Sequence, residues 1–321
     1  MRDVTVWVIA SSRDPGLHLL DPAPPGVTFV RGTRPEDFAD APRPHAFFVC
    51  SMKRDVVEPL WGRAGGVEWI HSRSAGLDTL LFPALVEGPA VLTNARGVYS
   101  PALAEFAAAA VLYFAKGFPR MLRSQAEGRW DPFDLEPVAG RTMGIVGYGD
   151  IGRAVAGKAR ALGMRVIAVR RRPEVSAGDP LVDEVLPLES RLELFRRADD
   201  VVVATPLTPE TRGLVGRAEI AAMKPTAVFV NLGRGPVVDE EALVEALEAG
   251  RIKGAALDVF AVEPLPDGHP FYRMGNVLLS PHCADNQPGW LDDSMRFFLG
   301  NLERYRRGEP LENVVDKRRG Y

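Results

Sequence analysis

Residues 142–163 place a short apolar run directly before three spaced glycines and a helical pattern. The segment reads TMGIVGYGDIGRAVAGKARALG, with glycines at positions 147, 149 and 152. Glycines at this spacing allow a tight turn, close approach of another group to the backbone, and close packing of a helix on a strand. The segment therefore predicts a strand and a helix packed face to face, which is the building unit of α/β folds.

Similar apolar runs alternate with helical patterns along the whole chain, which has 321 residues and is long enough for two domains. The alternation predicts parallel sheets with helices on both faces. Because one series of runs ends before residue 100 and another starts at 141, we expect two doubly wound domains. The expected strands are 4–10, 27–30, 46–50, 67–70 and 91–94, then 142–146, 165–169, 184–186, 200–204, 227–231, 254–258 and 277–279.

The segment SPALAEFAAAAVLYFAKG at 100–117 is nearly all apolar and predicts a helix. Ser100 is its expected N-cap, Pro101 its first residue, and Gly117 follows its end. Such a helix is either buried or forms a contact between subunits. Residues 116–140 are expected to be irregular, with Trp130 and Phe133 as anchors. An amphipathic helix at 288–309 lies beyond the last strand, which leaves open a return to the first domain.

Composition excludes several classes of protein. Hydrophobic residues make up 46% and charged residues 25%, with a net charge of −3, so a nucleic-acid partner is not expected. No uninterrupted apolar stretch is long enough to cross a membrane. The two cysteines, Cys50 and Cys283, match neither a disulfide framework nor a zinc motif, so no metal is expected. The N-terminus is typical of a first strand rather than of a signal peptide, and we expect a cytoplasmic protein.

The glycine segment also predicts a dinucleotide site. Gly147, Gly149 and Gly152, with Asp150 and Ile151 at the helix start, would hold a pyrophosphate at the positive helix end. A methyltransferase or a purely structural turn are the alternatives.

The next strand ends in three arginines. Arg170 stands 18 residues after Gly152, where an acidic residue would bind the ribose 2′-hydroxyl. Arginine instead binds a 2′-phosphate. We therefore expect NADP(H) as the preferred cofactor, with Arg170 and Arg171 as contacts and NAD(H) as the alternative. The alternative is that Arg171 and Arg172 simply cap a strand end in solvent.

Further strand ends carry candidate chemical groups, since ligands bind beyond the carboxyl ends of the strands in such sheets. Thr205 and Pro206 form a turn suited to lie along a cofactor. Arg234, Glu263 and His282 each follow a strand end and together suit the reduction of a 2-oxo acid. The histidine would donate the proton, the glutamate would favour the imidazolium, and the arginine would hold the substrate carboxylate. Taken singly, each could be a surface or structural residue, and a thiol nucleophile at Cys283 is disfavoured.

Several blocks in order resemble the D-isomer-specific 2-hydroxyacid dehydrogenases. The likeness runs from about residue 67 to 309, and the blocks are TMGIVGYGDIGRAVA, TPLTPETRGLV, FVNLGRGPVVDEEALVEAL, GAALDVFAVEP and LLSPHCA. The resemblance implies that Arg234, Glu263 and His282 are the catalytic set and that Asp258 holds the nicotinamide carboxamide. It also implies that the backbone amides of Ser74, Ala75 and Gly76 bind the substrate carboxylate.

The resemblance further implies a Rossmann cofactor domain inserted in a flavodoxin-like substrate domain. The substrate domain would comprise 1–99 and 288–321, and the cofactor domain 100–287. Family members are commonly homodimers through the region 100–117, which would account for the apolar helix there.

Two departures bear on specificity. Arg170 replaces the aspartate of NAD-using members and shifts the resemblance toward NADP-dependent glyoxylate/hydroxypyruvate-type reductases. Tyr99 is bulky where small polar residues are frequent, and it could shape the pocket together with Met52 and Trp290, or simply pack. The substrate, the direction of the reaction and the strictness of the cofactor preference stay open.

The leading prediction is NADPH-dependent reduction of a small 2-oxo acid to the D-2-hydroxy acid. An enzymatic alternative is NAD-dependent oxidation, including formate- and phosphite-type dehydrogenases. Ser280 stands where the formate type would carry glutamine. A nucleotide-sensing binding protein, similar to the family's corepressors, is the non-enzymatic alternative.

Overall fold

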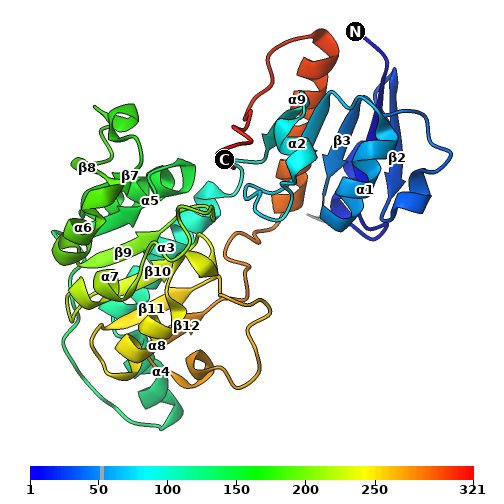
Figure 1. Cartoon of the computed structure of the whole chain (residues 1–321). Coiled ribbons are helices and arrows are strands. Elements are labelled where there is room, and N and C mark those ends of the chain that lie inside the picture. The colour runs from blue at the N-terminus through cyan, green and yellow to red at the C-terminus, as the bar shows by residue number, and fades with distance from the viewer. Residues whose placement is uncertain (51–53) are drawn as a thin grey trace. The chain divides into compact units, whose positions relative to one another are not determined.

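The computed structural model describes residues 1–50 and 54–321, and it divides into two compact units (Figure 1). Unit 1 comprises Met1–Tyr99 and Gln287–Tyr321, and unit 2 comprises Ser100–Asn286. Each unit contains one parallel sheet with helices, so the predicted α/β class is confirmed. Met52 lies outside the described residues.

Unit 1 is built on a five-stranded parallel sheet in the order β2-β1-β3-β4-β5. This is the doubly wound order of flavodoxin-like folds. The strands are β1 (Val4–Ile9), β2 (Val27–Gly32), β3 (Ala46–Val49), β4 (Trp69–Ser72) and β5 (Val91–Asn94). The helices are η1 (Pro15–Leu20), η2 (Pro35–Phe38), α1 (Arg54–Ala64), α2 (Pro83–Glu87) and α9 (Trp290–Arg307).

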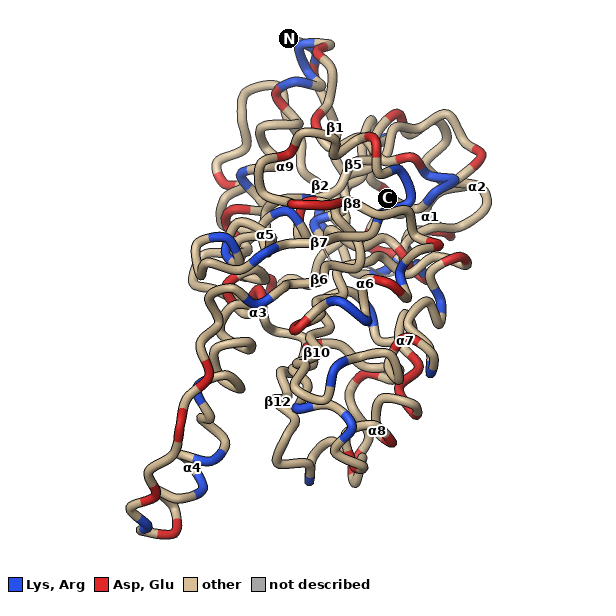
Figure 2. The backbone as a smooth tube through the Cα atoms, turned by 90° about the vertical axis from the view of Figure 1, so that its left-hand side faces the viewer, with Lys and Arg blue, Asp and Glu red and all other residues tan. Residues whose placement is uncertain are grey.

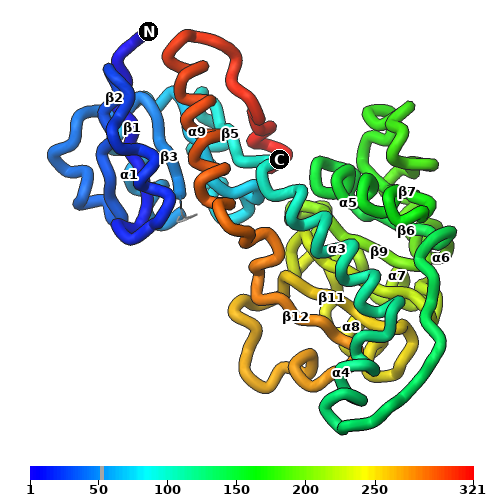
Figure 3. The backbone as a smooth tube through the Cα atoms, turned by 180° about the vertical axis from the view of Figure 1, so that it is seen from behind, coloured from blue at the N-terminus to red at the C-terminus, as the bar shows by residue number. Residues whose placement is uncertain are grey.

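Helix α9 packs on one face of the unit 1 sheet (Figure 3). The Phe298 ring stacks on Phe48 with centroids 3.9 Å apart, and on Trp69 at 5.6 Å. The strand predicted at 67–70 runs instead from Trp69 to Ser72. It continues past the apolar run because His71 is buried beside these rings and bonds to Thr93 Oγ1 at 2.7 Å. Burial lowers the pKa of His71 to about 3, so this histidine stays neutral.

Unit 2 is built on a seven-stranded parallel sheet in the order β12-β11-β10-β9-β6-β7-β8. The strand order reverses between β6 and β9, which is where such sheets bind ligands. The strands are β6 (Thr142–Val146), β7 (Arg165–Arg170), β8 (Glu184–Pro187), β9 (Asp200–Val203), β10 (Val228–Asn231), β11 (Gly254–Leu257) and β12 (Val277–Leu279). The helices are α3 (Ser100–Ala115), α4 (Phe118–Ala126), α5 (Asp150–Ala161), η3 (Pro173–Ser176), η4 (Leu188–Ser190), α6 (Arg191–Arg197), α7 (Arg217–Ala222), η5 (Gly235–Val237), α8 (Glu240–Glu248) and η6 (Pro270–Arg273).

Four predictions about the start of unit 2 were wrong in detail. Ser100 is the first residue of α3 rather than its N-cap, so Pro101 is the second residue of the helix rather than the first. The segment expected to be irregular contains α4, which projects from the body of unit 2 (Figure 2). Trp130 is 97% exposed and therefore does not act as an anchor among the described residues. Phe133 does act as an anchor, because the Arg120 guanidinium lies 4.4 Å from its ring centroid.

Helix α3 is apolar because it is buried within unit 2. It packs on α5, and the Phe114 ring lies so close to Gly254 of β11 that a methyl group there would come within 2.5 Å of it. Among the described residues, no single helix is long and apolar enough to span a membrane. Only the bent pair of α3 and α4 passes that test, by length and composition.

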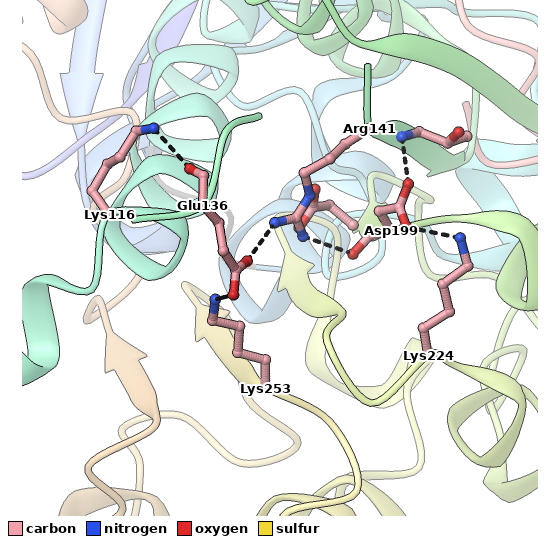
Figure 4. Close-up of polar contacts among 8 residues, drawn as sticks. Lys116, Glu136, Arg141, Asp199, Lys224 and Lys253 are labelled. Atoms are coloured by element: carbon pink, nitrogen blue, oxygen red, sulfur yellow. Dashed lines mark hydrogen bonds and ion pairs between the residues drawn. The ribbon is translucent and has the colours of Figure 1, made fainter. Parts of the chain in front are cut away.

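A network of charges ties the segment after α4 to the amino-terminal ends of the unit 2 strands (Figure 4). Glu136 accepts from Arg141 at 3.1 Å and from Lys253 at 2.7 Å. Arg141 also reaches the buried Asp200 at 2.7 Å, and Lys224 pairs with Asp199 at 2.7 Å. This edge lies opposite the carboxyl ends of the strands, where the candidate site lies.

Candidate active site

The three glycines after β6 serve three different purposes. Gly147 has a φ of +96°, a conformation that L side chains rarely adopt. A methyl group on Gly152 would come within 2.3 Å of the Gly147 carbonyl oxygen, so this glycine allows α5 to pack on the turn. At Gly149, in contrast, a methyl group would meet no heavy atom within 4 Å. The backbone there faces open space, which is what a bound pyrophosphate needs.

Helix α5 begins at Asp150, with Gly149 as its N-cap residue. The first amides of a helix have no intrahelical partner, so those of Asp150 and Ile151 can bind an anion beside the glycine turn. Thr205 closes the turn from β9, because its hydroxyl donates to the Val146 carbonyl at 2.9 Å. The shape of this turn fits a dinucleotide pyrophosphate, and binding there stays a prediction.

Arg170 is the last residue of β7, and its guanidinium is held in place locally. Its Nη1 donates to the hydroxyl of Ser176, a buried residue of η3. Arg171 is exposed, and its positive charge affects a residue in the loop after β9. The pKa of Glu210 in that loop is lowered, mainly because the Thr208 hydroxyl donates to it, and the charge of Arg171 adds to the effect. Sequence reasoning missed Ser176, although it lies only six residues from Arg170.

Glu263 and His282 form a close pair beyond β11 and β12. Glu263 Oε2 lies 2.7 Å from His282 Nδ1, and Glu263 Oε1 accepts from the Phe260 amide at 2.9 Å. A carboxylate only accepts hydrogen bonds, so Nδ1 carries the hydrogen. The Nε2 atom makes no hydrogen bond within the described part of the chain, and the His282 side chain is 44% exposed. His282 also has a φ of +52°, which is uncommon outside glycine and typical of strained functional positions.

The loop that carries Arg234 is pressed against the loop that carries Glu263. A methyl group on Gly235 would come within 1.8 Å of the Phe260 carbonyl carbon. Arg234 Nη1 donates to the Gly233 carbonyl at 2.8 Å, and Asn231 accepts from the Gly233 amide at 3.1 Å. The sequence placed Arg234, Glu263 and His282 at neighbouring strand ends, and the structure brings their loops to one edge of the sheet.

Asp258 is nearly fully buried and supports the His282 loop. Its Oδ1 accepts from the Ser280 hydroxyl at 2.6 Å and from the amides of Cys283 and Ala284 at 2.9 and 3.0 Å. Its Oδ2 accepts no hydrogen bond from the described residues, so this atom can receive a ligand donor such as a carboxamide. The loop is thus fixed by the same carboxylate that the resemblance assigns to the nicotinamide.

Asp285 and Glu240 are site residues that the sequence did not single out. Burial and the charge of Asp258 raise the pKa of Asp285, while His282 and Arg234 oppose the shift. Asp285 therefore lies close enough to Asp258, His282 and Arg234 for their charges to affect its pKa. Glu240 accepts from the Ala261 amide at 2.9 Å and braces the Glu263 loop. Asp285 could have been found from its position three residues after His282, whereas nothing local indicates Glu240.

The loop Ser74-Ala75-Gly76 follows β4 in unit 1, and the carbonyl groups of residues 73–75 are all bonded. The Arg73 carbonyl accepts from the Tyr99 hydroxyl at 2.5 Å, the Ser74 carbonyl from the Ala95 amide at 3.4 Å, and the Ala75 carbonyl from Asn94 Nδ2 at 2.6 Å. In a trans peptide the carbonyl and the following amide point in opposite directions. The amides of residues 74–76 therefore point away from these partners. The Ser74 amide donates to Ser72 Oγ at 3.3 Å. The amides of Ala75 and Gly76 donate to no described residue, which suits them to bind an anion.

Residues 108–284 match the family model for the NAD-binding domain of the D-isomer-specific 2-hydroxyacid dehydrogenases. The chain belongs to this family. It is therefore an NAD(P)-dependent oxidoreductase with a Rossmann cofactor domain. Among the described residues, no group of three or more His, Cys, Asp and Glu side chains is arranged to hold a metal ion.

Known family members are similar over most of this dehydrogenase. A glyoxylate reductase of Thermococcus gammatolerans is 40% identical over 232 residues, which are 71% of this chain and 68% of that protein. A D-isomer-specific 2-hydroxyacid dehydrogenase of Xanthobacter autotrophicus, solved with NADPH and MES, is 32% identical over the whole of both chains with a TM-score of 0.83. The NADPH-dependent glyoxylate/hydroxypyruvate reductase of Sinorhizobium meliloti, solved with NADP and sulfate, is 26% identical over 99% of this chain and 100% of that one, with a TM-score of 0.85.

Not every relative has the same length. A D-3-phosphoglycerate dehydrogenase of Methanocaldococcus jannaschii is 34% identical over 271 residues, which are 83% of this chain. This chain spans half the length of that protein.

Proposed function

We propose that this dehydrogenase uses NADPH to reduce a small 2-oxo acid, of the glyoxylate or hydroxypyruvate type, to the D-2-hydroxy acid. The Glu263–His282 pair carries the proposal. Its 2.7 Å contact orients the imidazole and leaves Nε2 without a partner among the described residues, at the edge of the sheet where the glycine turn lies. Relatives that are named glyoxylate or glyoxylate/hydroxypyruvate reductases support this substrate class.

The reaction needs a hydride and a proton. When bound, the reduced nicotinamide supplies the hydride to the carbonyl carbon of the substrate. His282 Nε2 gives the proton to the carbonyl oxygen, and Glu263 stabilises the imidazolium from which that proton leaves. Arg234 offsets the negative charge of the substrate carboxylate and polarises the carbonyl. The amides of residues 74–76 provide further donors for the same carboxylate.

The cofactor preference rests on Arg170 and Arg171. The Ser176 hydroxyl fixes the Arg170 guanidinium at the end of β7, where an acidic residue would repel a 2′-phosphate. Structures of family members that contain NADPH or NADP support the same choice. We expect Arg170→Asp to weaken turnover with NADPH far more than turnover with NADH, whereas the exposed Arg172→Asp should have little effect. An equal loss with both cofactors in Arg170→Asp would contradict this assignment.

The activity is tested by following the absorbance of NADPH and of NADH in parallel with a panel of 2-oxo acids. The panel includes glyoxylate, hydroxypyruvate, pyruvate and bulkier members. Absence of turnover with all of them would sink the proposal. His282→Ala should lose turnover while it still binds NADPH, and His18→Ala, which removes an exposed histidine of unit 1, should keep it. Retained turnover in His282→Ala would remove this residue from the mechanism.

We further propose a homodimer. Exposed apolar side chains gather on α4 and the segment after it: Phe118, Met121, Leu122, Trp130 and Leu135. A second copy of the chain would cover this surface, which adjoins the helix predicted to lie at the interface. Size-exclusion chromatography with light scattering should give twice the chain mass. Trp130→Ser should shift the mass toward the monomer, and Val314→Ser, at an exposed position in unit 1, should not. A monomeric wild type would refute the dimer.

A further inference from the structure

Arg73, which directly precedes the loop Ser74-Ala75-Gly76, is fixed at three points. Its amide donates to the Val49 carbonyl at 2.9 Å, and its carbonyl accepts from the Tyr99 hydroxyl. Its guanidinium makes two contacts of 2.8 Å with Asp14, from Nη1 to Oδ1 and from Nη2 to Oδ2. A two-point contact between planar groups fixes direction as well as distance. The start of the loop therefore has little freedom to rotate.

The Asp14–Arg73 pair is buried and is itself supported. The Asp14 and Arg73 side chains are only 9% and 11% exposed, so solvent screens their attraction weakly. Asp14 Oδ1 also accepts from the Gly16 amide at 3.1 Å, at the start of η1. Gly16 in turn leaves little space toward Met295 of α9, since a methyl group there would lie 3.1 Å from Met295 Cγ. The pair thus connects the loop to the packed interior of unit 1.

Tyr99 provides the second support. The residue is 7% exposed, and its ring packs edge-on against Trp290, with centroids 5.8 Å apart. Its hydroxyl fixes one side of the peptide between Arg73 and Ser74, and the Ser74 amide on the other side donates to Ser72 Oγ at 3.3 Å. The first peptide of the loop is therefore held on both sides, before the amides of Ala75 and Gly76. The Tyr99 hydroxyl therefore supports the loop from the side away from the amides of Ala75 and Gly76.

We propose that Asp14, Arg73 and Tyr99 are positioning residues, which hold the loop so that the amides of Ala75 and Gly76 keep the orientation that binds the substrate carboxylate. The inference rests on the proposed function of that loop. Without Asp14, the guanidinium would be buried without its charge partner and would move toward water. Without the Tyr99 hydroxyl, the first peptide of the loop could tilt, and donors aimed at the substrate would lose their alignment.

Tyr99→Phe is the decisive variant because it keeps the ring and removes only the hydroxyl. Tyr305→Phe is its matched control, since Tyr305 is also buried in unit 1 and its hydroxyl donates to Glu68 at 3.0 Å, away from the loop. We expect the KM for the 2-oxo acid to rise about five- to tenfold in Tyr99→Phe, as for the loss of one well-placed hydrogen bond. The dissociation constant for NADPH should stay within about twofold. Asp14→Asn should raise KM further.

Binding of oxamate, an unreactive 2-oxo acid analogue, to the NADPH-loaded protein gives a second readout that needs no turnover. Calorimetry should show weaker binding in Tyr99→Phe than in Tyr305→Phe. The proposal is overturned if Tyr99→Phe and Tyr305→Phe bind oxamate equally well and have the same KM for the 2-oxo acid, while their melting temperatures fall by the same amount. Tyr99 would then have only a structural role. If the wild type binds oxamate but reduces no 2-oxo acid, the proposed reaction fails while the positioning claim is still decided by binding. If the wild type does not bind oxamate, both are refuted.

Discussion

Replacing Gly149 by alanine should weaken cofactor binding while it leaves the fold of unit 2 intact. The added methyl group would meet no heavy atom of the protein within 4 Å, and the φ of −100° is accessible to alanine. Alanine lowers the entropy of the unfolded chain, which contributes about 0.4–1 kcal/mol of stability. It is also a poorer N-cap than glycine, which offsets this gain by a similar amount. The net change in unfolding free energy should stay within about 1 kcal/mol.

The effect on binding should be larger. The methyl group would stand where a pyrophosphate approaches the first amides of α5, and hydrogen bonds to a charged group contribute about 1.5–3 kcal/mol each. Loss of one such bond raises the dissociation constant for NADPH roughly 10- to 100-fold. A fluorescence titration with NADPH measures this constant, and urea unfolding measures the stability of the same preparation.

Gly152→Ala is the matched comparison, because its methyl group would lie 2.3 Å from the Gly147 carbonyl oxygen and 3.0 Å from Ile145 Cγ2. The backbone must shift to make room, which typically costs about 1–3 kcal/mol of stability. If Gly149→Ala binds NADPH as tightly as the wild type, the open face of the turn is not the pyrophosphate site. If the unfolding free energy of Gly149→Ala falls as far as that of Gly152→Ala, the added methyl group at position 149 does clash with the protein.

Three further predictions concern unit 2. Burial, which outweighs the attraction of Arg141, raises the pKa of Asp200 from 3.8 to about 7. The stability that the protonated Asp200 side chain contributes is therefore full below pH 3.8 and is lost as pH rises through about 7. The unfolding free energy of Asp200→Asn should therefore rise relative to that of the wild type by about 1.4 kcal/mol per pH unit between pH 3.8 and about 7. If the urea midpoints of the two proteins differ by the same amount at pH 5 and at pH 7, this prediction is contradicted. Glu263→Gln should lower kcat roughly 10²-fold or more with the NADPH dissociation constant unchanged; a wild-type kcat would show that the 2.7 Å contact does not serve the chemistry. Gly235→Ala should lower the melting temperature strongly, since its methyl group would overlap the Phe260 backbone, and an unchanged melting curve would disprove that packing.

Both sheets could be predicted from the sequence because buried parallel strands are continuous apolar runs bounded by turn residues. The limits of this signal are visible at β4. Its last two residues, His71 and Ser72, are polar, and the predicted strand therefore ended at Ile70. Only the fold supplies the aromatic rings and the Thr93 hydroxyl that make a buried, neutral histidine acceptable there.

Helix α4 was missed for a different reason. Its residues, FPRMLRSQA, are mixed in polarity, and Pro119 discourages a helix unless it falls in the first turn. The structure places Gly117 in the left-handed conformation immediately before, so that Pro119 does lie in the first turn. Trp130 was predicted to be an anchor from its residue type alone, whereas its side chain is almost fully exposed in the described part of the chain.

The residues of the candidate site likewise divide into those that sequence patterns indicate and those that only the fold brings together. Arg234, Glu263 and His282 could be located from the sequence because all strands of a parallel sheet end at one edge, so residues after successive strands meet there. Arg170 was accessible by counting from the glycine turn, and its partner Ser176 is local. The Asp14–Arg73 contact joins residues 59 positions apart and belongs to no motif. Whether such a pair is buried depends on the packing of η1 and α9, which no local pattern encodes. The groups proposed to act on the substrate are therefore predictable from strand ends, whereas the groups proposed to hold the loop of residues 74–76 in place emerge only from the fold.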